Sequence, residues 1–284
     1  MSAANPASGE IEAALAGLAT RGDDEIDLAE AALLLAALER PRVALDRYRL
    51  HLGDLAAAVG REAARRDGDM PALDARIGAL IQVVATEQGY RGDELTYDDL
   101  QNANLMRVID RRRGLPVALG ILYIHAARAQ GWTAHGVNFP AHFLIAVEHA
   151  GERAILDPFR GQRVGDAGAL RGLLKTMLGP DAELSPANSA ALANRAVLLR
   201  LQNNIKTRLI AQDRKDRALA AVERMLLFAP NQAELWREAG GLHGEIGNLR
   251  AAVAALEKFV ALTRDEAARH GAAQAIQTLR RRLH

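Results

Sequence analysis

Hydrophobic residues recur at helical spacing along the first third of the chain. Apolar positions in Ile26–Leu38 predict an amphipathic helix that ends before the Arg40–Pro41 step, because proline disfavours a helical residue before it. Two more helices are predicted over residues 41–65 and 71–86. The spacing returns over Tyr97–Arg113 and predicts a further helix there.

The next predicted helix, Pro116–Gln130, is apolar almost all round, which is typical of a helix buried in the centre of a domain. After Gly131 the pattern changes from helical spacing to alternation. It predicts three short strands, which are Trp132–Val137, Ala141–Glu148 and Glu152–Asp157. The front of the chain therefore predicts a helical core that carries a small antiparallel sheet.

Proline, glycine and serine cluster between two helical patterns at Gly179–Pro180 and Ser185–Ser189. This cluster predicts a boundary between a front domain over 1–185 and a second, all-helical domain over 190–284.

The second domain contains an internal repeat. Leu198–Asn231 and Gln232–Asp265 align as two units with the 34-residue period of tetratricopeptide repeats. Residues at consensus sites are Ala218, Pro230, Trp236, Gly240, Gly247 and Ala252. Lys206 departs from the pattern, because a small residue is usual there. Such an array is either purely structural or presents a groove to another protein.

Composition narrows the function classes. Lys and Arg total 36 against 35 for Asp and Glu, so no net field attracts nucleic acid or anionic lipid. Aromatic residues are 4% of a chain that is 49% hydrophobic, which suits closely packed helices and predicts an α+β, mostly helical fold. No apolar run has membrane-spanning length and Met1–Glu10 has no signal-like pattern, so we expect a cytoplasmic protein without a membrane partner.

The chain contains no cysteine, which excludes disulfides, thiolate metal sites and a cysteine nucleophile. The eight histidines show no spacing that would place two metal ligands on one helix face. Glycine-rich phosphate loops are absent as well. We therefore expect no metal and no cofactor.

His142 and Asp157 are the candidate catalytic pair. In a hairpin centred near Ala150, any register that pairs even with odd positions puts both side chains on one face. They would be opposite or diagonal, about 4.5 to 8 Å apart at Cβ, close enough for a carboxylate to orient an imidazole. The nucleophile of such a site usually stands at a helix N-terminus.

Three strings carry a resemblance to a known family: NANLMRVIDRRRGLPVAL at 102–119, GVNFPAHFLIAV at 136–147 and ILDPFRG at 155–161. They resemble the SirB family, whose members join a transglutaminase-like N-terminal domain to a tetratricopeptide tail. The specific resemblance covers roughly 90–161, and the tail agrees in kind. It implies a papain-like core, with one helix against a small antiparallel sheet, followed by an all-α array.

By the family's relation to the transglutaminase and papain-like superfamily, His142 corresponds to the catalytic histidine and Asp157 to the aspartate. Aligning the end of the central helix places Pro116 at the cysteine site, and a slip in alignment would place Val117 or Ala118 there. None of the three can attack a carbonyl. The serine that relatives commonly carry in this string is Ala118 here, so a hydroxyl nucleophile is absent too.

Asn102, Arg107 and Tyr123 are candidate binding residues, since they precede or lie on the central helix. The alternatives are a helix cap for Asn102, a solvated charge for Arg107 and a core position for Tyr123. The basic run at 111–113 is expected to complement the dipole of a helix end, and the alternative is that some of its side chains face the cleft.

Three functional hypotheses follow. The favoured one is a catalytically degenerate transglutaminase-like domain, a pseudoenzyme, that binds a peptide or protein segment and uses its tetratricopeptide tail as an adaptor. The second is a hydrolase or acyl transferase in which His142, oriented by Asp157, activates water or a substrate group. The third is a purely structural scaffold, which predicts that both side chains are fully buried with no cleft beside them.

Overall fold

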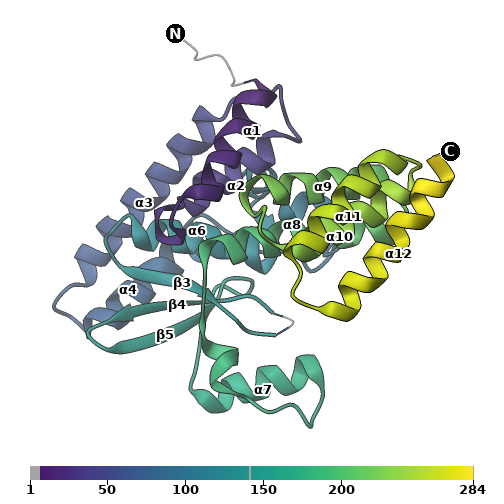
Figure 1. Cartoon of the computed structure of the whole chain (residues 1–284). Coiled ribbons are helices and arrows are strands. Elements are labelled where there is room, and N and C mark those ends of the chain that lie inside the picture. The colour runs from purple at the N-terminus through teal and green to yellow at the C-terminus, as the bar shows by residue number, and fades with distance from the viewer. Residues whose placement is uncertain (1–6, 141, 284) are drawn as a thin grey trace. The chain divides into compact units, whose positions relative to one another are not determined.

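The structure is a computed structural model that describes residues 7–140 and 142–283. Its contacts divide the chain into two units (Figure 1). The front unit contains Asp23–Leu198, and the second contains Ser8–Gly22 together with the chain from Leu199 on. This division differs from the predicted boundary at 185–190, and Ser8–Gly22 belongs with the second unit although it was predicted in the front domain.

Helices make up most of the front unit. The side chain of Asp27 accepts hydrogen bonds from the amides of Ala29 and Glu30, and this cap starts the first of them. The helices of this unit are α2 (Leu28–Ala37), α3 (Asp46–Arg66), α4 (Ala72–Leu80) with a π-helical continuation (Ile81–Glu87), α5 (Leu105–Arg111), α6 (Pro116–Arg128) and α7 (Ala167–Leu178).

The single helix predicted over Tyr97–Arg113 is divided in two. A 3₁₀ helix (Leu100–Ala103) ends at Asn104, whose backbone is extended. The Asn104 side chain accepts from the amide of Arg107 and so caps α5, and its Nδ2 donates to the carbonyl of Ala36 at 3.1 Å. This buried amide contact fixes the break.

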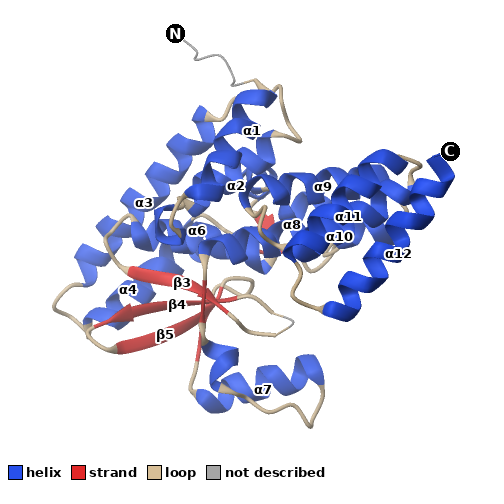
Figure 2. Cartoon of the chain, viewed as in Figure 1, coloured by secondary structure: helices blue, strands red, loops and turns tan. Residues whose placement is uncertain are grey.

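The sheet of the front unit has five antiparallel strands in the order β6-β5-β4-β3-β7. The three predicted strands are present as β3 (Thr133–Val137), β4 (Leu144–His149) and β5 (Glu152–Asp157). The short edge strands β6 (Gln162–Val164) and β7 (Ala191–Leu192) were not predicted. Figure 2 shows β3, β4 and β5 side by side.

The hairpin between β4 and β5 has a register of the kind that puts His142 and Asp157 on one face. Ile145 is paired with Leu156, so odd positions face even ones. Ala150 and Gly151 form its turn with φ of 51° and 84°, a conformation that glycine adopts readily. β4 begins later than predicted, and the predicted strand residue Ala141 lies outside the described residues.

The central helix α6 is buried against the sheet. All residues from Pro116 to Tyr123 are inaccessible to solvent or nearly so. A Cβ at Gly120 would lie 2.5 Å from the ring of Phe143, so the missing side chain lets the sheet approach the helix closely. The expected fold class, α+β and mostly helical, is therefore confirmed.

A two-stranded parallel ladder leads into α6. Its strands are β1 (Arg91–Gly92) and β2 (Arg113–Gly114), with Gly92 paired to Gly114. The sequence predicted no strand at either segment, because two-residue strands have no periodicity to detect.

The second unit is helical throughout. Helix α1 (Ser8–Gly17) packs on α9, with Ile11 and Leu15 buried. α8 begins in the front unit and its larger part belongs here. The helices that form this array are α8 (Asn194–Ala211), α9 (Lys215–Phe228), α10 (Ala233–Glu245), α11 (Leu249–Leu262) and α12 (Glu266–Leu283). Within residues 7–140 and 142–283, no helix is both long enough and apolar enough to cross a bilayer.

Candidate functional site

The structure brings together the two residues of the predicted catalytic pair. His142, just before β4, lies with its Nε2 3.0 Å from Oδ1 of Asp157, the last residue of β5. The histidine side chain is 8% exposed and the aspartate side chain 1% exposed. A carboxylate at this distance can orient an imidazole.

The turn after β5 holds Asp157 in place. Its Oδ1 accepts a hydrogen bond from the amide of Phe159 at 2.9 Å and a longer one from the amide of Arg160 at 3.4 Å. The Arg160 guanidinium lies 3.9 Å from Oδ2, which accepts no hydrogen bond from any residue that the structure describes. Asp157 therefore shapes its own loop as well as facing the histidine.

Phe159 is part of this site, and the sequence analysis gave it no role. Its ring meets the His142 ring edge to face, with centroids 6.4 Å apart and planes at 80°. The Phe159 ring also meets the Tyr97 ring edge to face, with centroids 5.9 Å apart and planes at 68°. The ILDPFRG string contained this phenylalanine, but its contact with the histidine depends on the fold.

The start of α6 is tied to the same place. The amide of Gly92 donates to the carbonyl of Phe159 at 2.8 Å, and Gly92 is paired with Gly114 two residues before Pro116. The helix N-terminus thus lies beside the loop that follows Asp157. The residues there are Pro116, Val117 and Ala118, all buried and all without a thiol or hydroxyl.

Tyr123 supplies a hydroxyl in this region. It is fully buried on α6, and its hydroxyl has no hydrogen-bond partner among the described residues. Burial, and secondarily the charge of Asp157, raise the pKa of Tyr123 well above its ordinary value. The phenol is therefore neutral at physiological pH and is not hydrogen-bonded to the imidazole.

The other two predicted binding residues point elsewhere. Asn102 is completely buried, and its Nδ2 donates to the carbonyl of Thr96 at 2.6 Å. Arg107 is partly exposed and donates to Oε1 of Gln101 at 2.9 Å. These bonds direct both side chains to the segment before α5. Ligand binding by Asn102, Arg107 or Tyr123 stays a prediction.

The basic run at 111–113 does more than complement a helix end. Arg111 donates to Oδ2 of Asp93 at 2.7 Å and to Oδ1 of Asn102 at 2.9 Å. Burial of Asp93 opposes its ionisation, but hydrogen bonds from Thr96 and Arg111 outweigh this and lower its pKa to about 2. Arg112, in a left-handed conformation, donates to His51 at 2.8 Å. The prediction for this run was therefore incomplete.

In the described part of the chain, no three His, Cys, Asp or Glu side chains come together in a group that could hold a metal ion.

Comparison with known proteins agrees with both units. The profile of the transglutaminase-like superfamily matches residues 46–203, and a tetratricopeptide repeat profile matches residues 205–283. The first match includes the His142 and Asp157 pair, and the second covers most of the predicted array.

The chain is also similar to whole proteins. It is 30% identical over 249 residues to a UPF0162 protein of Xylella fastidiosa strain Temecula1, which covers 86% of this chain and 87% of that protein. It is 28% identical over 238 residues to a UPF0162 protein of Vibrio cholerae, which covers 84% and 86% of the two chains. A stretch of 83 residues is 32% identical to F-box only protein 21 of the mouse. That stretch covers 29% of this chain and 13% of the mouse protein.

Proposed function

Because the chain belongs to the transglutaminase-like superfamily and to the UPF0162 family, we propose that it is a catalytically degenerate relative that binds a peptide or protein segment. Its tetratricopeptide tail acts as an adaptor. Membership of the SirB family in particular is part of this proposal.

One observation carries the proposal. The base and its orienting carboxylate are kept at 3.0 Å, whereas the start of α6 offers only carbon side chains where a nucleophile would stand. Catalysis through a covalent intermediate requires an attacking group that the base can deprotonate. Without one, a domain of this kind can still recognise an acyl group or carboxamide by hydrogen bonds.

The competing hypothesis is that His142 activates water or a substrate group directly. The orientation of His142 by Asp157 favours it, because a general base needs its imidazole fixed in one position. Burial of both side chains restricts access to the ring for a substrate and for a bound peptide alike, so it does not separate the two hypotheses.

The full-length protein separates the two hypotheses. It would be incubated with panels of fluorogenic amides and esters and, in parallel, screened for bound peptides from a display library. His142→Ala would be compared with His149→Ala, a second histidine of the same hairpin. We expect no turnover above buffer, and a set of bound peptides that changes with His142 alone. Turnover that disappears in His142→Ala and persists in His149→Ala would establish the enzyme instead.

A further inference from the structure

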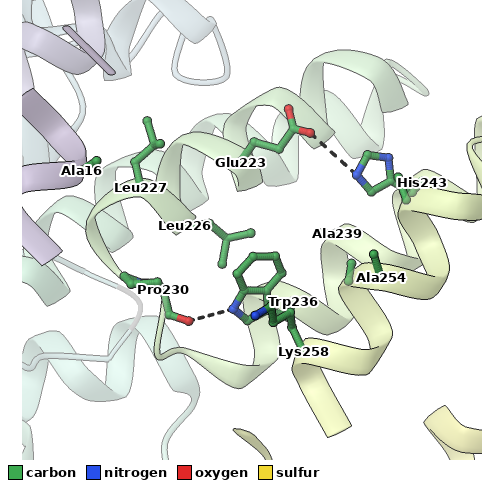
Figure 3. Close-up of a pocket in the computed structure, with 12 residues that line it drawn as sticks. Ala16, Glu223, Leu226, Leu227, Pro230, Trp236, Ala239, His243, Ala254 and Lys258 are labelled. Carbon is green, nitrogen blue, oxygen red and sulfur yellow. Dashed lines mark hydrogen bonds and ion pairs between the residues drawn. The ribbon is translucent and has the colours of Figure 1, made fainter. Parts of the chain in front are cut away.

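The second unit has an apolar groove of about 610 Å³ (Figure 3). Its walls come from α9, α10 and α11, and Ala16 of α1 adds to the rim. Leu226 and Leu227 line the α9 side and Trp236 lines the α10 side. This volume is in the range of sites that bind ligands or short segments.

Trp236 gives the groove a rigid apolar surface. Its indole Nε1 donates to the carbonyl of Pro230 at 2.7 Å, so the polar end of the side chain is satisfied. The ring remains partly exposed within the groove. The α11 side carries the small side chains of Ala254 and Ala255, which let a partner backbone approach closely, next to Lys258. Exposed tryptophan in a concave apolar surface is typical of an interaction site.

Three charged or titratable side chains line the groove, which are Glu223, His243 and Lys258. His243 lies with its Nε2 3.7 Å from the Glu223 carboxylate, and its buried Nδ1 has no hydrogen-bond partner in the described chain. Lys258 is exposed, and among the residues that the structure describes it forms no ion pair and no hydrogen bond. The groove therefore presents an apolar surface beside an unneutralised cation.

We propose that this groove binds an amphipathic helical segment of a partner protein, with aliphatic side chains against Trp236 and a carboxylate paired with Lys258. The groove is bounded by helices and offers no strand edge, so an extended peptide would leave its backbone unpaired, whereas a helix satisfies its own. The inference rests on the proposed adaptor function and names the chemistry of its partner.

The test selects short helical peptides from a display library on the full-length protein. Binding of the selected peptides would then be measured by fluorescence anisotropy against groove variants and matched controls on the same helix. Lys258→Glu reverses the groove cation, and Arg250→Glu makes the same charge change outside it. Ala254→Phe fills the groove, and Ala261→Phe adds the same ring to an exposed position elsewhere.

We expect enriched peptides with aliphatic residues at helical spacing and with Asp or Glu beside them. Their dissociation constants should rise at least about tenfold in Lys258→Glu and Ala254→Phe, and less than about twofold in the controls. The inference would be overturned if no peptide were enriched or if the enriched peptides were basic. It would also be overturned if the groove variants left the dissociation constants unchanged.

The same peptides would be tested against His142→Ala. Peptides that need His142 and ignore the groove variants would keep the proposed function and exclude the groove as its docking site. Peptides that respond to neither set of variants would count against both proposals.

Discussion

The ring of Phe159 fills the space that a side chain at position 92 would occupy. A Cβ built on Gly92 would lie 2.3 to 2.4 Å from three ring carbons. The same ring meets His142 edge to face, so this contact connects the ladder before α6 with the histidine.

Gly92→Ala should therefore destabilise the front unit by about 1 to 3 kcal/mol, because the ring must move to admit the methyl group. Urea unfolding of the full-length protein measures this. Gly53→Ala is the control, since nothing lies within 4 Å of its Cβ on α3, and there the free energy of unfolding should rise by about 0.5 to 1 kcal/mol. Equal stability of wild type and Gly92→Ala would show that the ring is free to move away.

Asp157→Ala should cost more stability than His142→Ala. The alanine at 157 leaves the amides of Phe159 and Arg160 without their acceptor as well as removing the partner of the imidazole. A buried donor left unsatisfied costs about 1 to 3 kcal/mol, and these two part-buried amides should cost less than that each. Chemical denaturation of both variants gives the comparison. If the two losses are equal, the turn is held by other contacts and the carboxylate serves the histidine alone.

The ionised carboxylate of Asp93 should stabilise the fold, and this stabilisation should be lost when acid protonates it. Its pKa is about 2 in the fold against an ordinary value of 3.8, so its contribution is complete above pH 4 and is lost as the pH falls towards 2. Asp93→Asn should lower the free energy of unfolding at pH 7 by about 1 to 3 kcal/mol, because Arg111 loses a charge-assisted bond. Between pH 4 and 2 the difference between the two proteins should shrink. A difference that stays constant across this range would contradict the assignment.

Gly240→Ala should destabilise the second unit, whereas Gly241→Ala should not. At Gly240 a Cβ would lie 2.7 Å from Cγ of Leu256, whereas at Gly241 nothing lies within 4 Å. We expect a loss of about 1 to 3 kcal/mol at 240 and a gain of about 0.5 to 1 kcal/mol at 241. Hydrogen exchange of α10 and α11 measures the effect locally. Unchanged protection in Gly240→Ala would mean that these helices can separate without cost.

The natural absence of cysteine allows a direct test of the site of the missing nucleophile. Single cysteines at positions 116, 117 and 118 would each be the only thiol in the protein, and the pH dependence of alkylation by iodoacetamide would report its pKa. The thiol that faces His142 should have a pKa below about 8.5, because of the helix dipole and the neighbouring histidine. His142→Ala should raise that pKa. If His142→Ala changed the pKa of none of the three thiols, the start of α6 would lie outside the site.

The sequence predicts best what depends on nearby residues. The centre of the front unit followed from an all-apolar helix at 116–130 and from a short turn at Ala150–Gly151, and the odd–even register then placed His142 and Asp157 on one face. All three are local patterns. The juxtaposition at 3.0 Å agrees with what they predicted.

The features that were missed depend on which particular group a polar side chain bonds to. Asn104 breaks a helix because it bonds to the carbonyl of Ala36, and no pattern near 104 indicates this. Asn102 is buried because Arg111 and the loop at Thr96 satisfy its amide. Hydrophobic periodicity indicates a helix or strand, but it does not identify which distant group will pair with a polar side chain.

The grouping of Ser8–Gly22 with the chain beyond Leu198 has a consequence for synthesis. Helix α1 is synthesised before the helix it packs on, α9, which follows almost two hundred residues later. Ile11 and Leu15 of α1 therefore stay uncovered by α9 until that helix has been translated. A gene fragment cut at the apparent boundary would yield a tail whose α9 surface is bare, and such a fragment should aggregate where the intact chain does not.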